Sequence, residues 1–179
     1  KYIKIFYIYI IRRMTSTSLH CLNDKWNYYY HLPGDSNWSL SSYKLIMGNI
    51  DSVEAVKKLN EQIRNPIIKN TMLFVMRDGI TPLWEDPKNR NGGCFSFKVL
   101  NRQVSDIWKS LLCALCGETL CIDSAKSQYV NGITISPKKN FCIIKVWLSS
   151  CDFQDPNTII DIPNLSKSGC IFKRHEPEF

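Results

Sequence analysis

Two amphipathic helical segments, each flanked by extended segments, constrain the fold of this 179-residue chain more than any other feature. The first helix is predicted over 52–63, where Asp51 serves as the N-cap and Glu54 follows three positions later. Its apolar face is formed by four residues at helical spacing, Val53, Val56, Leu59 and Ile63. The second helix is predicted over 103–116 and ends at Gly117. It carries six apolar residues at the same spacing, Val104, Ile107, Trp108, Leu111, Leu112 and Leu115.

Most of the remaining chain has the composition of β-strands. Extended segments rich in apolar or aromatic residues occur at 26–32, 43–47, 71–76, 94–100 and 141–149. Turn-rich segments at 33–37 and 87–93 predict hairpin-like connections. Because the helices occur singly between strands, we predict an α+β fold, a mainly antiparallel sheet with helices on one face. The other face of the sheet is then free to bind a ligand.

The first 13 residues, KYIKIFYIYIIRR, supply four positive charges and leave +3 of the net +7 for Met14 onward. Their apolar run is about half the roughly 20 residues that a membrane span requires, and basic residues follow it where a signal peptide has its cleavage site. We therefore expect Met14 to be the true start and residues 1–19 to be an N-terminal extension. Residues 20–179 have the length of a single domain, which we expect to be cytoplasmic and without a membrane segment.

The eight cysteines lack the spacing of a disulfide framework or a zinc site. Cys113 and Cys116 form one C-x-x-C pair inside the second predicted helix, and no second pair lies at zinc-ribbon distance. We expect reduced thiols, as in cytosolic proteins, and no bound metal.

Two tryptophans are predicted to lie on loops. Trp38 follows the turn PGDSN, and Trp84 follows Pro82. A loop tryptophan more often packs in a small satellite core than binds a ligand, but two that face each other can hold a flat ring between their indoles. Glu85 would then accept hydrogen bonds at the edge of that ring, for example from N1 and N2 of guanine. Methylation at N7 would make the guanine cationic and strengthen both contacts.

Three lysines are candidates for binding an anion. Lys138 and Lys139 form a pair on a turn, where such a pair is most often only solvated surface. In the segment that follows, Ile143, Lys145 and Trp147 share one face because alternate residues of a strand point the same way. Lys145 therefore places another cation near Trp147.

Signatures of catalysis in the sequence are weak. His20, His31 and His175 are not close to a recognisable serine or cysteine nucleophile motif. The chain has neither a phosphate-binding P-loop nor a dinucleotide fingerprint. Glu85 and Asp86 are neighbours in sequence, which does not make them an acid–base pair. We expect a binding protein without a cofactor rather than an enzyme.

The segment DGITPLWEDPKNRNGG, residues 78–93, is similar to the most characteristic segment of the eukaryotic translation initiation factor 4E family, the messenger-RNA cap-binding proteins. Further segments agree in order and spacing: HCLNDKW, SNW, DSVEAVKKLN, IWKSLLCALCGE and IIKVW. The resemblance covers residues 20–150. It implies a curved antiparallel sheet with two to three helices on the convex face, a cap-binding slot on the concave face, and a cap-binding domain over 20–179.

The resemblance assigns roles to the aromatic and acidic candidates. Trp38 and Trp84 would sandwich the N7-methylguanine, and Glu85 would accept hydrogen bonds from its N1 and N2. Trp147 would contact the methyl group. No metal or cofactor is implied.

The phosphate-binding residues depart from the family pattern. Lys138 stands where the family has a basic residue for the cap phosphates. The family's second phosphate lysine aligns with Ile143, so this role falls to Lys139 or Lys145. Cys94 stands where members often have an arginine, which implies weaker or differently arranged phosphate binding.

The helical face departs from the family at residues that bind protein partners. Members use this face to bind the scaffold factor 4G and the 4E-binding repressors, through a tryptophan and nearby apolar residues. This sequence keeps His20 and Val53, but Lys57 stands at the tryptophan position. Lys109 and Cys113 replace two leucines of the second helix. Because charges are unfavourable in an apolar contact, either the partner carries acids that pair with the lysines or the usual partner is not bound.

Four functions are therefore compared. The first is cap binding in translation initiation with a divergent 4G-like scaffold. The second is cap binding as a repressor or competitor that does not recruit the usual scaffold. A cap-processing enzyme is the third, although no cluster of acids that would hold a metal supports it. A general single-strand RNA binder, the fourth, would show little preference for N7 methylation.

Overall fold

A single seven-stranded sheet forms the centre of the computed structural model, which describes residues 19–175. The sheet order is β2-β1-β3-β5-β6-β4-β7, and every neighbouring pair is antiparallel. The strands are β1 (Cys21–His31), β2 (Lys44–Ser52), β3 (Met72–Arg77), β4 (Gly93–Leu100), β5 (Val130–Pro137), β6 (Phe141–Leu148) and β7 (Ile171–Arg174). The predicted α+β fold is confirmed, whereas the predicted start at Met14 lies outside the described residues.

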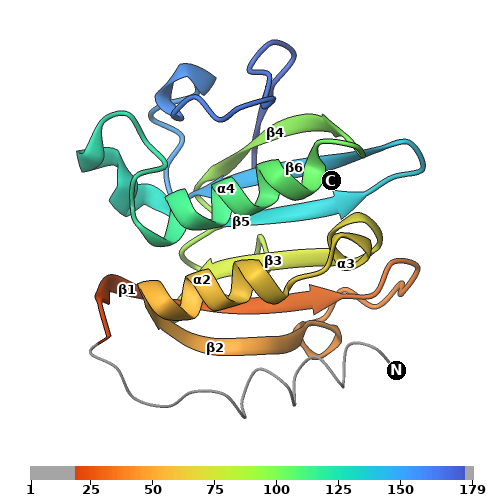
Figure 1. Ribbon diagram of the computed structural model, residues 1–179. Helices are drawn as coiled ribbons and strands as arrows, with labels where there is room; N and C mark the ends of the chain where they lie inside the picture. Colours follow the sequence, from red (N-terminus) through yellow and green to blue (C-terminus); the bar gives the residue numbers. More distant parts are fainter. Residues whose placement is uncertain (1–18, 176–179) are drawn as a thin grey trace.

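Within the described residues, three α-helices cover one face of the curved sheet (Figure 1). They are α2 (Val53–Gln62), α3 (Asn65–Asn70) and α4 (Val104–Cys116). In Figure 1, α2 crosses the half of the sheet that contains β1 and β3, and α4 crosses the half that contains β5 and β6. Three short 3-10 helices, η1 (Leu40–Ser42), η2 (Ser124–Tyr129) and η3 (Pro156–Thr158), lie in the connections.

Alternation along the strands separates a large core from the face that lacks helices. In β4, Phe95 and Phe97 are buried in the core between the sheet and the helices. The alternate residues Cys94, Ser96 and Lys98 therefore project from the opposite face. A small apolar cluster lies on that opposite face and consists of Phe74, Met76, Ile80, Cys94 and Trp147.

The start of α2 differs from the prediction. Ser52 is the N-cap, and its hydroxyl accepts a hydrogen bond from the backbone N–H of Ala55 at 3.4 Å. The capping role predicted for Asp51 is wrong because Asp51 is still part of β2. Val53 is 50% exposed, whereas the other three residues of the predicted apolar face are buried. The predicted second helix is confirmed as α4, with Gly117 as its C-cap.

One predicted connection is not a hairpin. Segment 33–37 joins β1 and β2, which do pair with each other. Segment 87–93 leads from β3 toward β4, but β5 and β6 lie between these two strands in the sheet. The connection over residues 78–92 therefore crosses the edge of the sheet where β5 begins and β6 ends. Strands β5 and β7 and helix α3 were not predicted.

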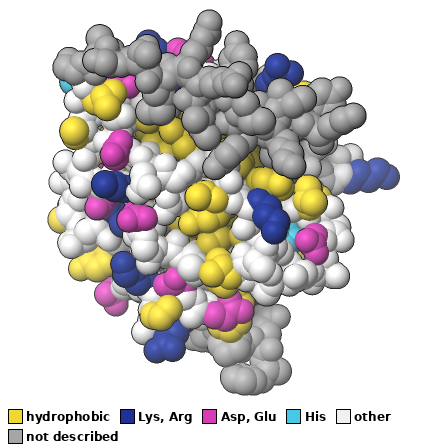
Figure 2. Space-filling view, turned by 90° about the horizontal axis from the view of Figure 1, so that it is seen from below, with side chains coloured by type: hydrophobic (Ala, Val, Ile, Leu, Met, Phe, Trp, Pro, Cys, Tyr) yellow, Lys and Arg dark blue, Asp and Glu magenta, His cyan; other side chains and the backbone are white. Residues whose placement is uncertain are grey.

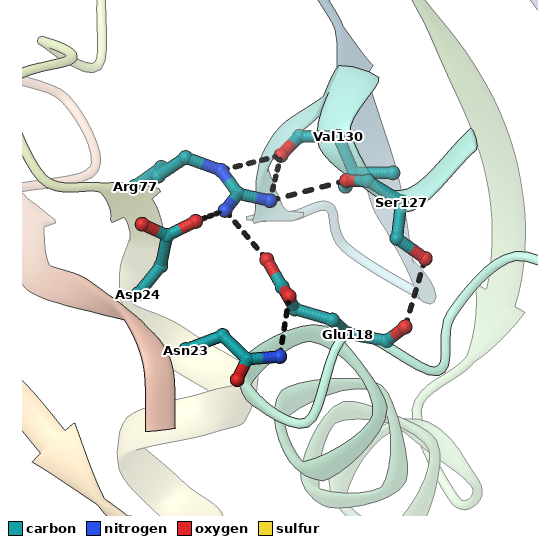
Figure 3. A network of polar contacts seen from close by, with 6 residues as sticks. All are labelled: Asn23, Asp24, Arg77, Glu118, Ser127 and Val130. Atoms are coloured by element: carbon teal, nitrogen blue, oxygen red, sulfur yellow. Dashed lines mark hydrogen bonds and ion pairs between the residues drawn. The ribbon is translucent and has the colours of Figure 1, made fainter. Parts of the chain in front are cut away.

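Arg77, at the end of β3, is the centre of a polar network (Figure 3). Its guanidinium forms ion pairs with Asp24 and with Glu118, the latter at 2.7 Å. The other nitrogens donate to the backbone carbonyls of Val130 and Ser127 at 3.1–3.2 Å. The N–H donors of the guanidinium thus have hydrogen-bond partners on several elements.

Glu118 extends this network to the end of α4. It adopts a φ of 54°, and its carboxylate accepts a further hydrogen bond from Asn23 at 3.0 Å. Burial alone would raise the pKa of Glu118, but the hydrogen bonds from Asn23 and Arg77 hold it below the ordinary value. The guanidinium of Arg77 also lies 4.7 Å from the ring centre of Trp26 in the core. The network therefore connects β1, β3 and β5 to the helical layer.

Candidate binding site

A cavity of about 360 Å³ lies on the face of the sheet that lacks helices. The loops after β1 and β3 form its walls, and strands β3, β5 and β6 form its floor. Six of the predicted ligand-binding residues line it: Trp38, Trp84, Glu85, Lys138, Lys145 and Trp147. Lys139 does not line the cavity and is exposed on the turn between β5 and β6.

Trp38 is supported by a histidine that the sequence had not assigned to the site. The ring of His31 stacks parallel to the indole, with 4.3 Å between ring centres. His31 is fully buried, and its Nδ1 and Nε2 lie 3.0 and 2.8 Å from the carbonyl oxygens of Leu32 and Asn37. These contacts fix the loop that carries Trp38. One face of the indole is covered by His31, so a ligand can stack only on the other.

Trp84 lies on an irregular loop that side chains hold in place. Asp86 accepts hydrogen bonds from the backbone N–H and the hydroxyl of Thr81 at 2.8 and 2.7 Å. Burial alone would raise the pKa of Asp86, but these bonds hold it below the ordinary value. The buried amide of Asn89 donates to the carbonyls of Thr81 and Leu83 at 3.1 and 2.7 Å. The loop is therefore rigid around Trp84, which remains 38% exposed.

Trp147 forms part of the floor and is only 7% exposed. Its indole N–H donates to the hydroxyl of Thr134 on β5 at 3.2 Å. His175 lies against its ring at 4.7 Å, and Nδ1 of this histidine is 2.9 Å from the carbonyl oxygen of Asn89. Burial lowers the pKa of His175, so the imidazole is neutral at pH 7. Trp147 is thus fixed in orientation without a positive charge from this histidine.

Charges of opposite sign enter the cavity from different elements. Glu85 comes from the loop after β3, whereas Lys138 and Lys145 come from the end of β5 and from β6. Burial raises the pKa of Tyr43 to about 12, and the negative charge of Glu85 contributes to this rise. The charges of the cavity are therefore complementary to a ligand that is cationic in one part and anionic in another.

Charged side chains of both signs occur on the surface beside β2. Figure 2 views the molecule from the β2 side and shows Lys, Arg, Asp and Glu side chains intermixed around exposed hydrophobic ones. This face carries no continuous basic area among the side chains that are drawn in colour. At the cavity itself, Lys138 and Lys145 supply positive charge that can attract an anionic ligand.

The helical face contains a second cavity of about 480 Å³ between α2 and α4. Four residues of the predicted partner face line it: Val53, Lys57, Lys109 and Cys113. Asn60, which was not predicted, donates from its side chain to the Lys109 carbonyl at 3.1 Å and to the Cys113 sulfur at 2.9 Å. The predicted residue His20 lies outside this cavity.

His20 instead contacts the first turn of α2. Its Nδ1 lies 2.6 Å from the Glu54 carboxylate, and its backbone N–H donates to the same group at 3.1 Å. The hydrogen bond from His20 lowers the pKa of Glu54. His20 therefore holds the start of the helix next to the groove.

The cysteines are free thiols in the structure. Burial raises the pKa of Cys116 and also that of Cys113, which keeps both thiols protonated at neutral pH. Within residues 19–175, no group of three or more His, Cys, Asp or Glu side chains could hold a metal ion. No helix in the described part of the chain is long and apolar enough to cross a membrane.

The fold and the cavity define a class of α+β binding proteins in which a curved antiparallel sheet carries helices on one face and an aromatic ligand cavity on the other. Residues 21–172 match the family model described as Eukaryotic initiation factor 4E. The chain is 33% identical over 160 residues to translation initiation factor 4E of Candida glabrata, an alignment that covers 87% of this chain and 71% of that protein. It is 40% identical over 87 residues to the factor 4E homolog of Acanthamoeba polyphaga mimivirus, covering 49% of this chain and 29% of that protein. The chain belongs to the eukaryotic initiation factor 4E family.

Solved structures agree with this membership. A schistosome eIF4E complexed with m7GpppG and 4E-BP has a TM-score of 0.66 and 27% identity, and the match covers 76% of this chain and 75% of that one. Ascaris suum eIF4E-3 with an m7G cap has a TM-score of 0.65 and 23% identity, covering 74% of this chain and 75% of that one. At that identity, the second likeness concerns the fold alone.

Proposed function

We propose that this protein binds the N7-methylguanosine cap of messenger RNA and acts without catalysis in translation initiation in the cytoplasm. The observation that supports this proposal most strongly is the cavity in which Trp38, Trp84 and Glu85 occur together with lysines. A cationic base stacks well between two indoles. The Glu85 carboxylate accepts from N1 and N2 of the base, and Trp147 contacts its methyl group. Lys138 and Lys145 then bind the phosphates.

Titration of the protein with N7-methylated GTP and with GTP, followed by tryptophan fluorescence, tests this function. We expect the methylated nucleotide to quench the tryptophan fluorescence, because its base stacks on the indoles. We also expect it to bind clearly more tightly than GTP, because the methylated base is cationic. Equal affinities would instead support a general single-strand RNA binder. Release of methylated nucleotide from capped RNA by the pure protein would support the cap-processing alternative.

The partner of the helical face is a 4G-like scaffold under the first proposal. The surface of this partner must accommodate the ammonium groups of Lys57 and Lys109, which line the groove between α2 and α4. These charges also favour the second candidate, a cap-binding repressor or competitor that does not recruit the usual scaffold. Copurification with a 4G-like scaffold supports the first function. Inhibition of capped-message translation by added protein supports the second.

Restoring an apolar groove is expected to strengthen binding of an ordinary 4E-BP peptide. The variant carries Lys57→Trp and Lys109→Leu, which removes two charges that an apolar partner would desolvate and adds an aromatic anchor. We expect roughly tenfold tighter binding or more in fluorescence anisotropy, since every 1.4 kcal/mol corresponds to a factor of ten. As a control, Lys98→Gln removes a charge from the opposite face and leaves peptide binding unchanged. Tight binding by the unaltered chain would show that the lysines do not hinder the usual partner.

A further inference from the structure

The concave surface continues beyond the cavity onto β4 and β7. Strand pairing places Trp147, Cys94 and Lys173 in one row across β6, β4 and β7. Because directly paired residues of antiparallel strands project to the same side, their side chains all lie on the face that lacks helices. The floor of the cavity is therefore continuous with a surface that the proposed cap site does not use.

The next two rows carry further lysines. Lys145 on β6 pairs with Ser96 on β4, and Lys98 pairs with Ile143. Neighbouring strands are about 4.8 Å apart and alternate residues about 6.7 Å apart along a strand, which is within the reach of a lysine side chain. Lys98, Lys145 and Lys173 thus surround Ser96 on three adjacent strands, β6, β4 and β7.

Two further observations place the charged ends of these lysines on the concave side. The Lys98 ammonium lies 4.6 Å from the ring centre of Phe141, which shares this face with Ile143. Burial raises the pKa of the Cys94 thiol, and the positive charges of Lys145 and Lys173 oppose that rise. Both ammonium groups are therefore close to the Cys94 side chain.

The concave-facing side chains of these three strands are basic, polar or apolar. The concave-facing residues of β4, β6 and β7 are Cys94, Ser96, Lys98, Leu100, Phe141, Ile143, Lys145, Trp147, Ile171 and Lys173. Leu100 and Ile171 are 44% and 66% exposed, so apolar area accompanies the cations. Spaced cations beside apolar and aromatic surface are typical of sites that bind single-stranded nucleic acid without reading its sequence.

We propose that Lys98, Lys145 and Lys173 bind the phosphates of the first nucleotides after the cap, so that the RNA leaves the cavity across β4 toward β7. This inference rests on the proposed cap-binding function. Lys145 is shared between the cap phosphates and the RNA path, whereas Lys98 and Lys173 contact only the RNA. Because the contacts are to phosphate, the nucleotide sequence after the cap has little effect on affinity.

The test compares N7-methylated GTP with a capped five-nucleotide RNA, using fluorescence titration at several salt concentrations. The variant carries Lys98→Gln and Lys173→Gln, and the control Lys57→Gln removes a charge from the helical face. We expect the double variant to bind capped RNA roughly tenfold more weakly and to bind N7-methylated GTP within about twofold of wild type. The slope of log affinity against log salt for the capped RNA should fall by about 0.7 per lysine.

Two results would overturn the RNA path. One is a capped-RNA affinity that the double variant leaves unchanged. The other is a loss of capped-RNA affinity that is equal for the double variant and for Lys57→Gln. This result would show that the affinity depends only on the net charge of the protein. In both cases the wild-type protein still prefers N7-methylated GTP over GTP. If the wild type shows no such preference, the proposed cap-binding function is wrong, and the proposed RNA path is then wrong as well.

Discussion

Replacing Trp84 with alanine is expected to weaken binding of N7-methylated GTP by about 1–3 kcal/mol, which is about 5- to 150-fold. The indole lines the cavity and is 38% exposed, so it contributes to the ligand surface more than to the core. The loop is held by the hydrogen bonds of Asp86 and Asn89 rather than by Trp84, so the variant should keep its fold. Fluorescence titration measures the affinity, and a melting curve checks the fold.

Two companion variants separate stacking from charge. Trp84→Phe keeps an aromatic ring and should recover part of the affinity. Glu85→Gln keeps the size of the side chain and removes its charge, which should cost about 1.5–3 kcal/mol because hydrogen bonds to a charged group are lost. Its effect should be larger for the methylated nucleotide than for GTP. A folded Trp84→Ala variant with wild-type affinity would show that the base does not stack on this indole.

Replacing Arg77 with methionine is expected to lower the free energy of unfolding by about 3 kcal/mol. The side chain of Arg77 is 13% exposed, and its loss leaves Asp24 and Glu118 without their cation. The carbonyls of Val130 and Ser127 also lose their donors. Urea denaturation at pH 7 measures the change. The exposed residue Arg102 provides the matched control, because Arg102→Met should change stability by no more than about 0.5 kcal/mol.

The same network makes the protein sensitive to acid. The pKa of Glu118 in the folded protein is below its ordinary value of 4.5, so the carboxylate stabilises the fold above about pH 4.5. This contribution is lost as the pH falls through the folded pKa. Glu118→Gln should therefore be less stable than wild type at pH 7 and should lose less stability between pH 5 and pH 3. An equal loss of stability between pH 5 and pH 3 in both proteins would mean that other carboxylates determine the acid sensitivity.

The parts of the fold that the sequence predicted well have strong periodicity. Helix α4 repeats apolar residues at helical spacing along its whole length, and Gly117 ends it as expected. Strand β5 was missed because Gly132 and Pro137 interrupt an otherwise alternating pattern. The close approach at Gly132 explains the glycine, since a Cβ there would lie 2.3 Å from the carbonyl oxygen of Val75. Sequence periodicity does not report such contacts between strands.

Most of the predicted ligand-binding residues line one cavity, but the residues that support them were not predicted. Trp38, Trp84 and Glu85, which line the cavity, were singled out because of the turn residues around them and the resemblance to a family. His31 gave no such signal, since a histidine at the end of an aromatic strand does not reveal what it stacks on. Lys173 was missed together with β7, a strand of four residues whose pairing with β4 depends on tertiary structure.

The sheet order also determines when the cavity can form during folding. The loop over residues 78–92 connects β3 to β4, which lie three strand spacings apart, or about 14 Å. The gap is filled by a β5–β6 hairpin made later in the chain, and Asn131 of β5 donates to the Lys88 carbonyl at 2.8 Å and to the Asn89 side chain at 2.9 Å. Because these contacts join distant parts of the sequence, they form late and slowly. During synthesis, the cavity can form only after β6 (Phe141–Leu148) has left the ribosome.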